Sequence, residues 1–177
     1  MHTDFFLTPK AEEARYQLHN NNVEDPGYQK FVSPIVQTIF NDFDCNHQGL
    51  DFGSGTAPVI TSLLHKQKYN VTTYDPFFNP DQKALEKTYD YIICCEVMEH
   101  FYNPAKEFEL LYSLLKKDGV LYCKTNLFNE SIDFKTWWYK NDDTHVFFYT
   151  RETLEWICNK YGFKNLNNAK NLIVFKK

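Results

Sequence analysis

The stretch Gly49-Leu50-Asp51-Phe52-Gly53-Ser54-Gly55-Thr56 decides the fold of this chain. It predicts a short buried strand that ends in an acid, followed by a two-glycine turn and the start of a helix. The glycines allow positive φ and a close approach of the backbone to a ligand. Ser54 or Thr56 would cap the helix, with Pro58 in its first turn, where no amide hydrogen is needed. Because amides at a helix start favour a negative group in front of them, we expect a ligand here.

A second acid follows at a distance that suits a nucleoside site. Asp75 ends the next strand-like run, Val71-Thr72-Thr73-Tyr74, and its spacing from the glycines fits a carboxylate that binds both hydroxyls of a ribose. Asp51 precedes the glycines, and Pro58 stands where the dinucleotide fingerprint has its third glycine. The two motifs together resemble those of the class I S-adenosylmethionine (SAM) methyltransferases. A nicotinamide-binding domain and a plain α/β domain are the alternatives.

The resemblance implies where SAM would bind. The amides of the glycine turn would lie beneath its amino-acid part, with Asp51 near the ammonium and Asp75 at the ribose. Phe77 would pack on the adenine, or else fill core space. A leading helix often covers the pocket in this family, so Tyr16 or Arg15 would contact the methionine carboxylate, unless they lie on a solvated helix face. The implied cofactor-binding residues are Asp51, Gly53, Ser54, Gly55, Tyr74, Asp75, Phe77, Glu96 and Tyr16.

Strand-like and helical runs alternate along the chain and end in a hairpin, which predicts a three-layer α/β sandwich. Expected helices run from Pro9 to about Leu18, from Tyr28 or Ser33 to Phe43, over Val59 to Lys68, from Pro104 to Asp118-Gly119, and from Thr150 to Gly162. The resemblance implies a Rossmann-like, mostly parallel sheet with a C-terminal antiparallel hairpin. The segment between Asp75 and Tyr89 barely allows a parallel crossover, so the usual third strand is expected to be reduced or missing. We divide the single domain into an N-terminal helical lid region, 1–45, and a methyltransferase core, 46–177.

Composition narrows the class of protein. A chain of 177 residues suits one domain with a full core. A formal charge of -4 argues against a general phosphate-binding surface. Five cysteines without CxxC spacing indicate buried thiols and a reducing cytoplasm. We find no signal peptide at the first residues and no apolar run long enough to span a membrane, so no membrane partner is expected.

A cluster of acids and histidines follows the fourth predicted strand region. In Glu96-Val97-Met98-Glu99-His100, a helical conformation would place Glu96, Glu99 and His100 on one face, and His145 lies in a later loop. Such ligands suit Mg²⁺, Mn²⁺, Fe²⁺ or Zn²⁺. The Glu-x-x-Glu-His run with a later His resembles the metal-dependent small-RNA 2′-O-methyltransferases, and the run also occurs in ubiquinone-pathway O-methyltransferases. Alternatively, no metal binds and His100 caps a helix or lines the acceptor pocket.

These observations predict a cytoplasmic SAM-dependent methyltransferase. We expect O-methylation of a small hydroxylated or aromatic acceptor, with or without a metal, and we expect Glu99, His100 and His145 to be catalytic. The aromatic run from Trp137 to Tyr139 would stack on a planar acceptor or anchor its loop. The rival enzyme is an RNA-terminus 2′-O-methyltransferase, and a rival of another class is a non-catalytic scaffold with the SAM fold. The sequence does not predict the oligomeric state.

Overall fold

The computed structural model describes residues 2–18, 22–169 and 171–177. Six strands in this part of the chain form one sheet in the order β2-β1-β3-β4-β6-β5. The strands are β1 (Gln48–Phe52), β2 (Asn70–Tyr74), β3 (Tyr89–Cys95), β4 (Leu115–Lys124), β5 (Asn165–Ala169) and β6 (Leu172–Lys176). The first four are parallel, while β6 and β5 pair antiparallel. The predicted α/β fold with its C-terminal hairpin is therefore confirmed.

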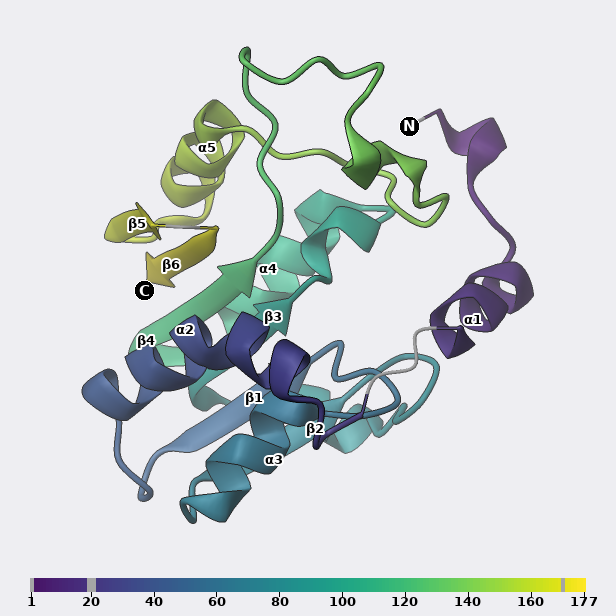
Figure 1. Cartoon of the computed structure of the whole chain (residues 1–177). Helices are drawn as coiled ribbons and strands as arrows, with labels where there is room; N and C mark the ends of the chain where they lie inside the picture. The colour runs from purple at the N-terminus through teal and green to yellow at the C-terminus, as the bar shows by residue number, and fades with distance from the viewer. Residues whose placement is uncertain (1, 19–21, 170) are drawn as a thin grey trace.

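Helices cover both faces of the sheet (Figure 1). On one face lie α2 (Pro26–Asp42) and α3 (Val59–Lys66), and on the other α4 (Pro104–Leu114) and α5 (Arg151–Tyr161). The alternation of side chains along β3 explains these two layers, because Ile92 and Cys94 belong to the core beneath α4 and α5, whereas Tyr91 and Ile93 face α2 and α3. The first helix, α1 (Pro9–Gln17), stands apart from both layers.

The crossover from β2 to β3 lacks a strand of its own in the described residues, as the sequence predicted. It carries the short 3-10 helix η2 (Gln82–Glu86), and the Tyr89 hydroxyl donates a hydrogen bond to the Ala84 carbonyl at 2.8 Å. The other 3-10 helices are η1 (Thr3–Phe5), η3 (Met98–His100) and η4 (Trp138–Asn141).

Two predicted helix boundaries are wrong. Helix α2 begins at Pro26, because the Asp25 carboxylate accepts hydrogen bonds from the amides of the first turn. Pro34 lies inside this helix, where its missing amide would leave the Lys30 carbonyl unsatisfied, but the Ser33 hydroxyl donates to that carbonyl at 2.8 Å. Helix α4 ends at Leu114, well before the expected stop at Asp118-Gly119, because Leu115 already pairs with β3.

Helix α3 begins at Val59 as predicted, but the prediction of its cap is wrong. Neither Ser54 nor Thr56 caps this helix, which begins at Val59 after Pro58. The reason lies in the turn, since the amides of Gly53 and Ser54 both donate to the Tyr74 carbonyl, at 2.8 and 3.1 Å. These bonds tie the turn to the end of β2 and delay the helix.

Two further predictions were an N-terminal lid region, 1–45, and the absence of a membrane-spanning segment. Val32, Ile35 and Ile39 of α2 are fully buried against the sheet, so this part of the predicted lid region packs in the core, whereas the residue 45 boundary stays a prediction. Among the described residues, every helix is too short or too polar to cross a bilayer.

Gly49 tests the packing between β1 and β3. A Cβ at this position would lie 2.3 Å from the Tyr91 ring, so we expect Gly49→Ala to cost roughly 2 kcal/mol of unfolding free energy in urea titrations. The matched control is Tyr91→Phe, which removes a buried hydroxyl without a hydrogen-bond partner in the described residues and should cost nothing. Equal stability of Gly49→Ala and wild type would contradict this packing.

Candidate functional site

A cavity of about 750 Å³ opens where β1, β2 and β3 end. This is the edge at which open parallel sheets bind ligands. The cavity has the size of a small-molecule site and contains residues from the glycine turn, from the segment after β2, from the segment after β3, and from α1. All the predicted cofactor-binding residues lie on its wall: Asp51, Gly53, Ser54, Gly55, Tyr74, Asp75, Phe77, Glu96 and Tyr16.

The glycine turn adopts the expected backbone conformation. Gly53 and Gly55 have φ of 79° and 65°. A Cβ on Gly53 would also lie 2.4 Å from the Val97 side chain, so this position needs glycine for both its conformation and its neighbour. The space beside Gly55 is open within 4 Å, so its backbone is accessible from the cavity.

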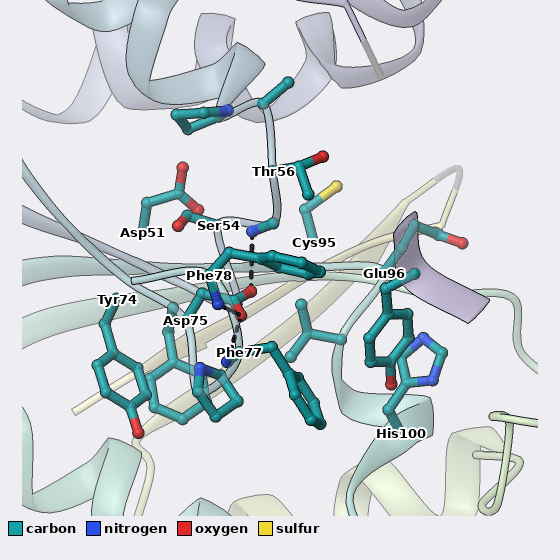
Figure 2. Close-up of a pocket in the computed structure, with 18 of the residues that line it drawn as sticks. Asp51, Ser54, Thr56, Tyr74, Asp75, Phe77, Phe78, Cys95, Glu96 and His100 are labelled. Carbon is teal, nitrogen blue, oxygen red and sulfur yellow. Dashed lines mark hydrogen bonds between the residues drawn. The ribbon is translucent and has the colours of Figure 1, made fainter. Parts of the chain in front are cut away.

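Asp75 joins the two turns that form one end of the cavity. Its Oδ2 accepts the Gly55 amide at 2.9 Å, and its Oδ1 accepts the amides of Phe77 and Phe78 at 2.9 and 3.0 Å. Figure 2 shows these bonds converging on the carboxylate beside the two phenylalanine rings. Asp75 therefore fixes the distance between the glycine turn and the segment after β2.

Asp51 lies beneath the glycine turn and is 5% exposed. The Thr61 hydroxyl donates to its Oδ2 at 2.7 Å. Burial raises the pKa of this carboxyl to about 6, and the nearby Asp75 adds to the rise, while the bond from Thr61 opposes it.

Helix α1 contributes Tyr16 to the cavity. The Tyr16 hydroxyl donates to Glu12 Oε1 at 2.7 Å, and its ring lies 5.5 Å from the Phe77 ring and 5.3 Å from the His100 ring, measured between centroids. Tyr16 thus spans from the glycine-turn end of the cavity to the histidine end. Arg15, the alternative to Tyr16, instead pairs with Asp142 at 3.1 Å and is absent from the cavity wall.

The expected helix through Glu96 is wrong. Glu96 has a φ of 53°, in the left-handed region, and only the short η3 follows. The Glu96 amide donates to the Lys124 carbonyl at 2.7 Å, which holds it at the end of β4 and prevents the helical turn. Non-glycine residues occupy this region at a cost, and they concentrate at functional sites.

Glu96 and Glu99 meet around one tyrosine. The Tyr139 hydroxyl donates to Glu99 Oε1, lies 3.3 Å from Glu96 Oε2, and pairs with the Thr125 hydroxyl at 2.9 Å. The other oxygen of each glutamate is buried and has no hydrogen-bond partner among the described residues. Burial raises the pKa of Glu96 to about 8 and that of Glu99 to about 7, and the proximity of Glu99 adds to the rise at Glu96.

His100 and His145 complete this end of the cavity. Nδ1 of His100 bonds the Thr144 carbonyl at 3.0 Å, and Nδ1 of His145 bonds the Tyr139 carbonyl at 2.7 Å. Because a carbonyl can only accept, each Nδ1 carries a proton, and Nε2 is the nitrogen that can accept a proton or ligate a metal.

Three of the four predicted metal ligands come together. One ligand atom from each of Glu99, His100 and His145 lies within 4.8 Å of the others. Glu96 is not in this group, and the helical spacing on which its prediction depended does not form.

Sequence reasoning missed several residues of the site. Tyr139 was expected to stack on the acceptor or anchor its loop; it is 2% exposed, and its hydroxyl also contacts both glutamates, which the sequence did not predict. Tyr28 and Phe31 of α2 line the cavity although their helix packs on the sheet, and no motif marked them. The exposed Trp138 lies at the cavity wall, whereas Trp137 packs against Phe148 within its loop.

Known proteins resemble this chain in sequence and in fold. The family described as a methyltransferase domain matches residues 26–168. A ubiquinone biosynthesis O-methyltransferase of Colwellia psychrerythraea is 32% identical over 100 residues, which are 55% of this chain and 39% of that protein. The chain thus matches about two fifths of that relative's length.

Two solved structures have the same fold at low sequence identity. A SAM-dependent methyltransferase of Archaeoglobus fulgidus has a TM-score of 0.64 and 17% identity, over 84% of this chain and 94% of that one. A 1,6-didemethyltoxoflavin-N1-methyltransferase of Burkholderia thailandensis, bound to its substrate and S-adenosylhomocysteine, has a TM-score of 0.66 and 13% identity, over 97% and 91%. These matches confirm the predicted Rossmann-like methyltransferase fold.

The buried Asp51 predicts a pH-dependent stability. Its folded pKa of about 6 exceeds the ordinary 3.8, so the unfolded chain ionises first as the pH rises. The stability of wild type relative to Asp51→Asn should therefore fall by about 3 kcal/mol between pH 4 and pH 6 and stay constant above. Urea unfolding of both proteins across this range measures the difference, and parallel curves would contradict the assignment.

Proposed function

We propose that this chain, which belongs to the methyltransferase-domain family, transfers a methyl group from SAM to a small hydroxylated or aromatic acceptor. The observation that carries the proposal is the cavity whose one end is the glycine turn joined to Asp75 and whose other end holds Glu96, His100 and His145. Methyl transfer to a hydroxyl requires a site for the nucleoside of SAM beside groups that can accept the hydroxyl proton, and this cavity offers residues for both.

The residues at the glycine turn fit SAM. A carboxylate offers about four acceptor positions, and Asp75 uses three for backbone amides, so it retains capacity for a ribose hydroxyl. The ring of Phe77 would cover the adenine, and Asp51, once ionised, would favour the cationic methionine end. Ser54 and Tyr74 complete the proposed cofactor site, and Glu96 would stand between the cofactor and the acceptor.

The protein's part in the reaction is mainly alignment. SAM supplies a methyl group on an activated leaving group, so the enzyme has to hold the acceptor in line with it and exclude water. Tyr16 lies between Phe77 and His100 and would close the cavity over both ligands. The ion pair between Arg15 and Asp142 would hold α1 in that position.

A hydroxyl acceptor must also lose its proton. His100 and His145 line this end of the cavity, and we propose them, with Glu99, as the catalytic residues. Glu99 is fully buried and accepts a hydrogen bond from Tyr139. Its carboxylate would therefore orient the imidazoles of His100 and His145 and balance the positive charge that they gain with a proton. The O-methyltransferase activity named for the Colwellia relative supports oxygen as the methylated atom.

The same end fits a divalent metal. Two imidazoles and a carboxylate are suitable ligands for Mg²⁺, Mn²⁺, Fe²⁺ or Zn²⁺, and the unpartnered buried oxygen of Glu99 would gain a partner. Such an ion would lower the pKa of an acceptor hydroxyl. We therefore include metal assistance in the proposal, with Glu99, His100 and His145 as ligands.

The proposal also covers the class of substrate and the cellular compartment. The Burkholderia neighbour binds a small molecule, 1,6-didemethyltoxoflavin, and the Colwellia relative is named for ubiquinone biosynthesis, which together support a small acceptor over an RNA end. A non-catalytic scaffold is the alternative of another class, and SAM binding separates it from an enzyme. The free thiols Cys94 and Cys123, both buried, support a reducing compartment, and we propose the cytoplasm.

Asp75 should be required for SAM binding. We expect Asp75→Asn to weaken SAM binding about tenfold or more in calorimetry, because an uncharged amide holds the ribose and the Gly55 amide less strongly. Asp81→Asn is the matched control, because Asp81 accepts the Lys83 amide outside the cavity wall. If Asp75→Asn bound SAM as tightly as wild type, or if wild type did not bind SAM, the proposal would be contradicted.

Metal binding can be measured separately from activity. Titration of Mn²⁺ followed by electron paramagnetic resonance should detect one site that Glu99→Gln and His145→Ala each weaken about tenfold or more. His47, which pairs with Asp44 away from the cavity wall, is changed to Ala as the control, and this variant should bind as wild type does. Full methyl transfer in chelator, with no metal found by elemental analysis, would remove the metal from the mechanism.

A further inference from the structure

The wall of the cavity is acidic. It carries Glu12, Asp51, Asp75, Glu96, Glu107 and Asp142, and none of its described residues is a lysine or an arginine. Carboxyl groups in this number favour ligands of opposite or no charge, and Glu96, with a pKa of about 8, adds its charge above neutral pH. A phosphate or carboxylate on the acceptor would face these groups without a cationic partner on the wall.

Two cations lie near the cavity, but each is turned to another group. Arg15 pairs with the Asp142 carboxylate at 3.1 Å. Lys124 is buried at 6% exposure, and its Nζ lies 4.2 Å from the centroid of the Phe31 ring. These contacts balance part of the negative charge near the cavity. Neither Arg15 nor Lys124 is thus available on the cavity wall to pair with an anionic ligand.

Glu96 carries an unused hydrogen-bond acceptor on this wall. Its Oε1 is buried and lacks a hydrogen-bond partner in the described part of the chain, while Oε2 faces the Tyr139 hydroxyl. The backbone of Glu96 is held in the left-handed region by its bond to the Lys124 carbonyl. Because Tyr139 donates its one hydroxyl proton to Glu99, the Glu96 carboxylate retains the capacity to accept a hydrogen bond from a ligand.

We propose that the methyl acceptor carries no negative charge and donates an N–H or O–H hydrogen bond to Glu96. The aromatic side chains Tyr28, Phe31 and Trp138 on the same wall suit a flat ring. The acceptor class is thus an uncharged or cationic hydroxylated ring, such as a phenol or an aminoalkyl phenol. This inference rests on the proposed function, and it disfavours an RNA end, whose phosphates are anionic.

Three probes of one ring test the charge rule. Catechol is neutral, dopamine is cationic and 3,4-dihydroxybenzoate is anionic, while all share the two adjacent hydroxyls. Binding is measured by ligand-observed NMR in saturating S-adenosylhomocysteine and EDTA, so that neither turnover nor a metal contributes. We expect the benzoate to bind at least about tenfold more weakly than catechol, and dopamine to bind at least as tightly as catechol.

Variants assign the effect to the wall. At pH 8.5, above the pKa of about 8 at Glu96, Glu96→Gln should reduce the preference for catechol over the benzoate by about threefold or more, because it removes the carboxylate charge and keeps the shape. Glu107→Gln, on α4, should act in the same direction and replaces Glu96→Gln if that protein does not fold. Glu109→Gln is the matched control, since Glu109 lies on the same helix but is exposed and outside the cavity.

Some outcomes would overturn the proposal. These are a benzoate that binds as tightly as catechol, a preference unchanged in both wall variants, or no binding of any probe at millimolar concentration. Titration of S-adenosylhomocysteine alone is run beside them. If the nucleoside fails to bind, the proposed function fails, whereas binding of the nucleoside with the wrong order of probes refutes only the acceptor class.

Discussion

The structure depends on the Asp75 carboxylate and the three backbone amides that it accepts. Gly55 belongs to the turn after β1, whereas Phe77 and Phe78 follow β2, so one side chain connects two neighbouring parallel strands at their carboxyl ends. The Tyr74 carbonyl reinforces this connection by accepting the amides of Gly53 and Ser54. These bonds shape one end of the cavity without any ligand, which lowers the conformational cost of binding one.

The other end of the cavity is built from buried acids. Glu99 has no exposed surface, and its oxygen is held by a tyrosine that comes from a loop about forty positions later in the chain. Burying two carboxyl groups side by side is costly unless they are protonated, hydrogen-bonded or matched by a cation. The raised pKa values of Glu96 and Glu99 express that cost. A ligand or ion that supplies a donor or a positive charge here would therefore be bound tightly.

Local patterns predicted the parts of the structure that depend on neighbouring residues. The glycine turn, the acid at the end of β2, the missing third strand and the Thr150 cap of α5 follow from short-range chemistry, and the structure has each of them. The missing cap of α3 and the backbone of Glu96 could not be predicted in this way, because both depend on carbonyls of other strands, those of Tyr74 and Lys124. The role of Tyr139 likewise depends on tertiary packing, which a single sequence does not reveal.

The central claim is that the cavity between the glycine turn and Asp75 holds the nucleoside of SAM. A crystal structure of the protein soaked in S-adenosylhomocysteine tests it most directly. We predict a ribose hydroxyl within hydrogen-bond distance of an Asp75 oxygen, with the adenine beside Phe77 and the bond from the Gly55 amide intact. A cavity without the nucleoside, or a nucleoside bound away from Asp75, would contradict the account.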